Sequence, residues 1–169
     1  MLRDLGSALA PDNAFAIIQG LETVALRMKQ HCENAEKVVN FLKKHKEVTK
    51  VIYSTEHEKK IADRAKQYLK DGNGPMVGIE LKGGIEAGKR FIESLKMFYH
   101  VANIGDARSL AIHPASTTHS QLNEKELAAS GVTQSYVRLC IGIEHIDDII
   151  DDLDQALNKS SKGSLKAGS

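Results

Sequence analysis

The chain has 169 residues, of which 41% are hydrophobic and 27% charged, with a formal net charge of +1. This length allows one domain with a substantial core, and the composition is that of an ordinary globular protein. Basic and acidic residues are mixed, so no basic face is expected for nucleic acid, and no apolar run approaches the roughly 20 residues that a membrane span needs.

The N-terminus and the cysteines indicate the compartment. Residues 1–12 form a lead-in that ends at Pro11 and Asp12 and lacks the apolar core of a secretory signal. Cys32 and Cys140 lie far apart and no CxxC pair occurs, so neither a disulfide framework nor a zinc site is indicated. We therefore expect a cytoplasmic protein with reduced cysteines.

The first predicted element is one long helix over residues 13–44. Its apolar residues alternate spacings of four and three, as on one face of a helix, and they are Leu21, Ala25, Met28, Cys32, Ala35, Val39 and Leu42. Such a helix is on the order of 48 Å long, whereas a compact domain of this size is about 40 Å across. The helix is therefore predicted to extend beyond its own domain. Further apolar residues in its first half, such as Phe15 and Ile18, predict a second packing partner.

The rest of the chain alternates strands and helices. The predicted strands are residues 48–54, 76–82, 99–104, 109–112 and 136–142. The predicted helices are residues 58–69, 85–98, 123–131 and 145–157. Short connections between alternating elements predict an α/β sandwich over residues 48–157, with a small sheet and helices packed on one face. Residues 13–157 would form one domain, and the Lys-, Ser- and Gly-rich residues 158–169 are expected to be a disordered tail.

Two features predict a ligand site. Residues 100–122 form a polar segment with only short apolar pieces, of the kind that often carries substrate contacts, although a surface loop without a ligand is the alternative. Arg138 stands in a predicted strand, on the face opposite its apolar residues. A buried guanidinium there needs an anionic partner. The partner is either a ligand or an internal carboxylate, Asp106 or Glu144, and both readings stay open.

No catalytic or metal motif accompanies these features. His113 and His119 lie six residues apart, and no carboxylate spacing completes a metal site. The sequence contains neither a GxSxG nucleophile elbow nor a phosphate-binding glycine loop. Asp106 and Glu144 could serve as acid and base, but a loop cap or an ion pair is the simpler role for each. Cys140 is expected to be a small buried core residue.

Three stretches carry a resemblance to a known family. They are NAFAIIQGLETVALRMKQHCENA at residues 13–35, NIGDARSLAIHPASTTHSQL at 103–122 and YVRLCIGIEHIDDIIDDLDQAL at 136–157. Together they closely resemble the pyridoxal-phosphate enzymes of cysteine and methionine metabolism, the cystathionine γ-synthase-like family. Within it they are most similar to the O-acetylhomoserine sulfhydrylases, in part because Asn103 stands where lyases and synthases of the family typically have Ser. The likeness covers residues 2–157.

The resemblance implies the C-terminal domain of the aspartate-aminotransferase-type fold, with a long N-terminal linker helix. It also implies that the larger N-terminal domain, which carries the Schiff-base lysine and the other cofactor contacts, is missing. No catalytic, cofactor-binding or metal-binding residue is therefore expected in this chain. The implied partners are pyridoxal phosphate, O-acetylhomoserine, the N-terminal cofactor domain and further copies of the chain in a homo-oligomer.

By the same resemblance, Arg138 holds the substrate's α-carboxylate in a bidentate fork, which Lys would do poorly. Asn103 and the backbone near Ser109 help to position that carboxylate, and Thr117 and Thr118 lie near the pocket rim. The chain is thus expected to be the substrate-binding part of a transferase of methionine biosynthesis and to be inactive alone. The alternative is a stand-alone module that binds amino acids or associates with an intact homologue without catalysis.

Overall fold

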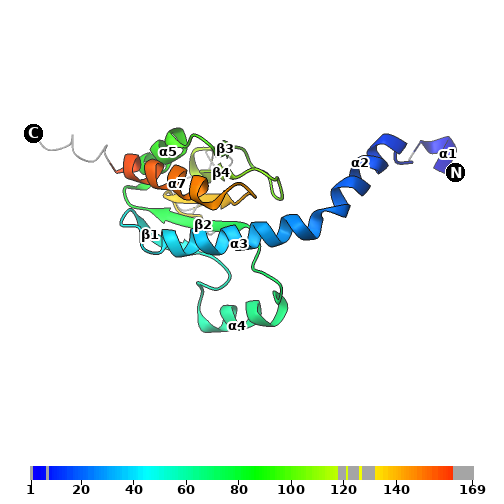
Figure 1. The fold of residues 1–169 in the computed structure, drawn as a ribbon. Helices are drawn as coiled ribbons and strands as arrows, with labels where there is room; N and C mark the ends of the chain where they lie inside the picture. Colours follow the sequence, from blue (N-terminus) through cyan, green and yellow to red (C-terminus); the bar gives the residue numbers. More distant parts are fainter. Residues whose placement is uncertain (1, 7, 118–120, 122–125, 127–131, 162–169) are drawn as a thin grey trace, which may run out of the picture.

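The computed structural model shows a five-stranded sheet with helices packed on one face, as predicted (Figure 1). The structure describes residues 2–6, 8–117, 121, 126 and 132–161. The strands are β1 (Val48–Ile52), β2 (Met76–Leu81), β3 (Tyr99–His100), β4 (Leu110–Ile112) and β5 (Tyr136–Cys140). Their order in the sheet is β1-β2-β5-β4-β3, and neighbours are antiparallel except for the parallel pair β3 and β4. Each of these strands lies entirely within a range that the sequence predicted to be a strand.

The core lies between one face of the sheet and the helices α3 (Val24–Leu42), α5 (Gly84–Ser94) and α7 (Ile146–Ser160). The register pairs Val77 with Leu139 and Ile79 with Val137, so these buried side chains share the helix-covered face. Phe91 of α5 is fully buried against them. Each such side chain contributes about 1.5–3 kcal/mol by leaving water. The helix α4 (Lys59–Tyr68) lies apart from the other helices (Figure 1).

The helix predicted over residues 13–44 is two helices in the structure, so the prediction of one continuous helix is wrong. Thr23 separates the helix α2 (Pro11–Glu22) from α3. Its φ of −111° and ψ of 3° are not helical. Gly20 weakens the last turn of α2 because glycine loses more backbone entropy than other residues. The guanidinium of Arg27 donates a hydrogen bond to the Gly20 carbonyl (2.6 Å), which satisfies an acceptor at the end of α2. The apolar spacing continues across Thr23 and could not reveal this break.

The first part of the chain extends away from the sheet, as predicted (Figure 1). A short helix, α1 (Leu2–Leu5), precedes α2, and no residue of α2 is buried. Six large apolar side chains of α2 and early α3 are exposed, and we call them the apolar arm: Phe15, Ile17, Ile18, Leu21, Val24 and Leu26.

Two helix ends differ from prediction. The helix α5 stops at Ser94 because the buried carboxylate of Asp152 in α7 holds the next backbone segment in another conformation. This carboxylate accepts hydrogen bonds from the N–H groups of Lys96 (2.9 Å), Met97 (2.8 Å) and Phe98 (3.3 Å).

The helix α7 continues to Ser160, so residues 158–160 are not part of a disordered tail, contrary to the prediction. Ser160 is buried, and its carbonyl accepts a hydrogen bond from Nε of Arg90 (2.9 Å). The predicted helix over 123–131, apart from Glu126, and the tail from residue 162 lie outside the described residues. Among the described helices, none has the length and apolar character of a membrane span.

Candidate functional site

Arg138 lies on the sheet face that the helices leave open. In β5, Val137 and Leu139 are buried under the helices, whereas Arg138 points to the other side and is half-buried. Its cross-strand neighbours are Gly78 in β2 and Ile112 in β4. The alternation along the strand thus placed the guanidinium on the face that was expected.

A cavity of about 230 Å³ opens beside this arginine, and we call it the Arg138 cavity. It is bordered by the end of β1 with the loop that follows it, by the first half of β2 and by β5. Its lining residues are Ile52, Tyr53, Ser54, His57, Met76, Val77, Gly78, Tyr136 and Arg138. The cavity therefore combines a permanent cation with an imidazole, a hydroxyl and two phenols.

The ring of Tyr136 lies over Gly78. A Cβ atom at position 78 would come within 2.7 Å of the Tyr136 Cε2 atom and 3.0 Å of its hydroxyl oxygen. Glycine therefore leaves the space in which the ring lies. Burial raises the pKa of the Tyr136 phenol, and the charge of Arg138 opposes this effect. Because an unperturbed tyrosine titrates near pH 10, the hydroxyl is protonated at neutral pH and can donate a hydrogen bond.

Within the part of the chain that the structure describes, Arg138 forms no ion pair with a carboxylate. The two carboxylates considered from the sequence have other partners. Asp106 accepts the N–H of Arg108 (3.0 Å), and Glu144 accepts two hydrogen bonds from Ser109. Neither of these carboxylates is therefore the anionic partner of Arg138. The remaining alternative is that the guanidinium binds an anionic ligand.

Ser109 is buried and joins two parts of the fold. Its N–H donates to Oε1 of Glu144 (2.6 Å), and its hydroxyl donates to Oε2 (2.9 Å). The same hydroxyl oxygen accepts the N–H of Gly142 (2.8 Å). Asn34 of α3 holds this segment from the other side, because its amide donates to the carbonyls of Gly142 (3.1 Å) and Glu144 (2.9 Å). These bonds fix the chain that leaves β5.

Of the other predicted site residues that the structure describes, Asn103, Ser109 and Thr117 do not line the Arg138 cavity. Asn103 is exposed after β3, and its side-chain oxygen accepts the N–H of Ile104 (2.9 Å). Thr117 is half-buried and donates to the carbonyl of His113 (2.9 Å), while Thr118 lies outside the described residues. The substrate-binding roles of Asn103, Ser109, Thr117 and Thr118 remain predictions.

Among the residues that line the cavity, sequence reasoning identified only Arg138 as a site residue. Tyr136 could have been found, because it shares the strand face of Arg138 at a spacing of two. Gly78, Ser54 and His57 come from other elements, and only the pairing of the strands brings them to Arg138.

His113 has a structural role in the fold. Its Nδ1 lies 2.8 Å from the Ser116 hydroxyl and its Nε2 lies 2.8 Å from the Gln134 carbonyl, and the ring is fully buried. Burial lowers the pKa of the imidazole, although the bond to Gln134 opposes the shift. A Cβ at Gly88 of α5 would overlap with Nε2 of His113, so this glycine makes room for the ring. Among the described residues, no cluster of His, Cys, Asp and Glu could hold a metal ion.

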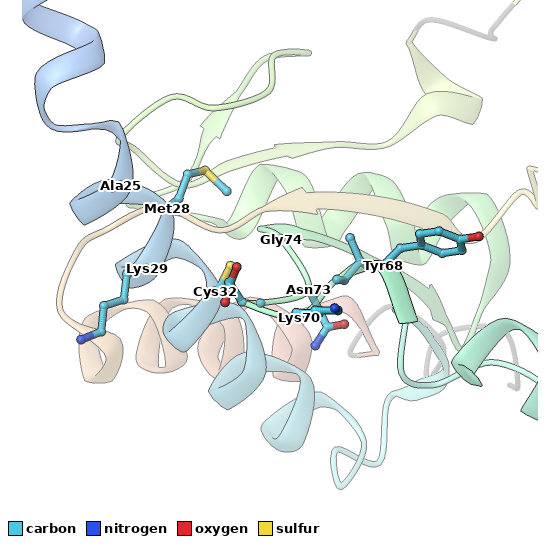
Figure 2. A pocket seen from close by; sticks show the side chains of 11 residues that line it. Ala25, Met28, Lys29, Cys32, Tyr68, Lys70, Asn73 and Gly74 are labelled. Atoms are coloured by element: carbon cyan, nitrogen blue, oxygen red, sulfur yellow. The ribbon is translucent and has the colours of Figure 1, made fainter. Parts of the chain in front are cut away.

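A larger cavity of about 610 Å³ lies between α3 and the loop before β2 (Figure 2). It is lined by Ala25, Met28, Lys29, Cys32, Tyr68, Leu69, Lys70, Asp71, Gly72, Asn73 and Gly74. Figure 2 shows Lys29 pointing away from Cys32 and Asn73, so its ammonium group does not converge with the other polar groups on one point. The Arg138 cavity is smaller, but a half-buried cation lines it together with other polar side chains, and it is the better candidate for chemistry.

The fold and a family match together define the class of protein. A family model described as "Cys/Met metabolism PLP-dependent enzyme" matches residues 1–158. The chain belongs to this family of pyridoxal-phosphate-dependent enzymes. The predicted resemblance and fold class are confirmed.

The relatives of the chain include sulfhydrylases and a lyase. The chain is 52% identical over 157 residues to the O-acetyl-L-homoserine sulfhydrylase of Leptospira meyeri, covering 92% of this chain and 36% of the relative. It is 46% identical over 156 residues to O-acetyl-L-homoserine sulfhydrylase 1 of Thermus thermophilus, covering 92% and 37%. It is also 43% identical over 159 residues to the L-methionine gamma-lyase of Fusobacterium nucleatum subsp. polymorphum, covering 94% and 40%. The chain thus spans little more than a third of the length of these relatives.

A solved structure agrees with the fold. The crystal structure of a protein from Campylobacter jejuni, assigned as an O-acetylhomoserine (thiol)-lyase, superposes with a TM-score of 0.82 at 46% identity. The match covers 93% of this chain and 37% of the other, which carries N′-pyridoxyl-lysine-5′-monophosphate.

The residues around Arg138 do not fit the attachment of this cofactor. Pyridoxal phosphate is held by a lysine Schiff base, and none of the lysines that the structure describes lines the Arg138 cavity. The described lysines are exposed, apart from Lys89, which is half-buried and pairs with Glu86 (2.8 Å). The donors in the cavity instead suit a carboxylate, which a guanidinium can bind with two parallel hydrogen bonds.

Proposed function

We propose that this chain is the substrate-binding C-terminal part of a pyridoxal-phosphate-dependent O-acetylhomoserine sulfhydrylase. The whole enzyme would convert O-acetylhomoserine and sulfide or methanethiol to homocysteine or methionine and acetate, in the cytoplasm and as a homo-oligomer. One observation carries the proposal: Arg138 is half-buried in a cavity and has no carboxylate partner among the described residues. The sulfhydrylases among the relatives support the choice of reaction.

In this proposal the chain supplies orientation. The guanidinium of Arg138 binds the α-carboxylate of the amino acid, and the rigid sheet fixes the direction in which the rest of the substrate points. The bonds of Ser109 and Asn34 to the segment after β5 keep this strand end in place. The cofactor, when bound by the whole enzyme, supplies the electron sink for the elimination and for the thiol addition that follows.

The chain alone is proposed to lack catalytic activity, because among the described residues no lysine lines the cavity to attach the cofactor. The second candidate, a stand-alone module that binds amino acids without catalysis, rests on the same arginine. The two differ in what the chain does when the rest of the enzyme is supplied.

A graft distinguishes them. In the Leptospira meyeri sulfhydrylase, the matching segment is replaced by this chain, and sulfhydrylation of O-acetyl-L-homoserine is measured. We expect an active graft, in which Arg138→Ala lowers kcat/KM at least about tenfold, or roughly 1.4 kcal/mol. The control Arg64→Ala, at an exposed arginine of α4, should leave kcat/KM unchanged. If Arg138→Ala keeps the kinetics and lowers stability, Arg138 is a structural residue. A folded, cofactor-loaded graft without activity would favour the stand-alone module.

A further inference from the structure

The Arg138 cavity has a second donor that the proposed function does not use. Tyr136 precedes Arg138 by two residues on the same strand face, and both line the cavity. Because both side chains border one small cavity, they can act on the same ligand group. The hydroxyl of Ser54 in the same cavity already donates to the side-chain oxygen of Asn73 (2.8 Å).

Gly78 decides where the Tyr136 ring lies. It stands directly opposite Arg138 in β2, and its missing side chain leaves the space under the ring. With a Cβ there, the ring atom Cε2 at 2.7 Å and the Ile52 Cβ at 3.1 Å would both be too close. Ile52 is part of β1 and has little freedom to move, so the Tyr136 ring would have to give way. Its hydroxyl would then leave its present position.

The size of the cavity limits what it can take. At about 230 Å³ it is smaller than the roughly 300–1,000 Å³ of pockets that enclose whole ligands. It therefore suits the charged end of a ligand, whose other end projects out of the open sheet face. A planar carboxylate can accept hydrogen bonds on both oxygens, which matches one guanidinium and one protonated phenol.

We propose that Tyr136 binds the carboxylate of the amino acid together with Arg138, and that Gly78 determines this by leaving room for the ring. The inference rests on the proposed function, since it names a second residue for the same carboxylate. The phenol donates its hydrogen to the carboxylate oxygen that faces β2, and Arg138 donates to both oxygens. Loss of the carboxylate charge should weaken both interactions, because hydrogen bonds to an ionised acceptor are the stronger ones.

The test uses the chain itself and O-acetyl-L-homoserine as the probe. Binding is followed by the NMR shifts of the backbone amides of β5 during titration, because these groups are present in every variant. The methyl ester of the probe, which lacks the carboxylate charge, is the control. Tyr136→Phe should weaken binding about threefold to tenfold, as expected for one hydrogen bond. Tyr68→Phe, at an exposed tyrosine of α4, should leave the affinity unchanged.

A double-mutant cycle tests the role of Gly78. Gly78→Ala should weaken binding by a similar factor, and adding Tyr136→Phe to it should have little further effect, because the phenol has already been displaced. Gly20→Ala, at a glycine with nothing within 4 Å, is the matched control and should not change binding. If Gly78→Ala does not fold, Tyr136→Phe alone tests whether Tyr136 binds the carboxylate.

The outcomes separate the two proposals. If Arg138→Ala abolishes binding while Tyr136→Phe leaves it unchanged, the role of Tyr136 is wrong and the proposed function stands. If the unmodified chain shows no saturable shift, or binds the methyl ester as well as the free acid, the carboxylate site is wrong and this inference falls with it.

Discussion

Ser109 and Glu144, which are 35 residues apart in the sequence, are joined by two hydrogen bonds, from the N–H and from the hydroxyl of Ser109. Gly142 lies against this pair, and a Cβ there would come within 2.5 Å of the Ser109 nitrogen. The pair connects the polar segment after β3 to the chain that leaves β5. The predicted ligand segment and the strand of Arg138 are therefore parts of one rigid unit.

Replacing Ser109 with alanine should lower the free energy of unfolding by about 2 kcal/mol. The change removes a hydrogen bond to a carboxylate and leaves the buried N–H of Gly142 without its acceptor. Urea denaturation measures the effect. Ser94→Ala, at a half-buried serine that ends α5, should change the stability by less than about 0.5 kcal/mol. Equal stability of Ser109→Ala and the unmodified chain would contradict the structural role.

Asp152→Asn should destabilise the chain by about 2 kcal/mol or more. The carboxylate accepts three backbone N–H groups at the end of α5, and an amide would turn donors toward one of them. Asp151→Asn on the same helix is the matched control, because Asp151 is exposed, and it should stay within about 0.5 kcal/mol. The two midpoints of urea unfolding should differ clearly, and coincident midpoints would refute the capping role.

The stability of the chain should depend on pH through His113. Its folded pKa is lowered by burial, whereas the unfolded histidine titrates near pH 6.5. Above about pH 6.5 both states are neutral, and the contribution of the buried ring is complete. As the pH falls below this value, the unfolded state takes up the proton first, so the free energy of unfolding decreases until the pH passes the folded pKa.

NMR titration of the His113 ring should therefore give a midpoint below 6.5. Urea unfolding at several pH values should show that His113→Gln weakens the loss of stability on acidification. A His113 midpoint above 6.5 would reverse the sign and disprove the argument.

The apolar arm should cause self-association. Phe15 and Ile18 are 65% and 53% exposed, and contiguous exposed apolar surface favours contacts with other molecules. Sedimentation velocity should show larger species as the concentration of the chain increases. Phe15→Glu combined with Ile18→Lys should shift the chain to monomer without loss of the fold, because no residue of α2 is buried. Ile61→Lys, at a 45% exposed position of α4, should not have this effect. A clean monomer of the unmodified chain at high concentration would be the contrary result.

Periodicity in the sequence was enough to predict the α/β class and the face of Arg138. Val137 and Leu139 alternate with Arg138, and because side chains of a strand point to opposite faces in turn, burying the first two turns the third away from the helices. The family was predicted from the amino-acid sequences of three motifs, and the match to the family model confirmed it. These properties depend on short stretches of sequence, so they could be predicted without knowing which distant residues are in contact.

Only the tertiary structure decided the features that depend on distant partners. The break at Thr23 is invisible to a spacing that continues through it, and the end of α5 depends on Asp152, a residue of another helix. The partners of Glu144 and the position of the Tyr136 ring over Gly78 depend on which strands pair and in which register. Periodicity along one element reports which face is buried, whereas hydrogen-bond partners and free space depend on elements that meet only when the chain folds.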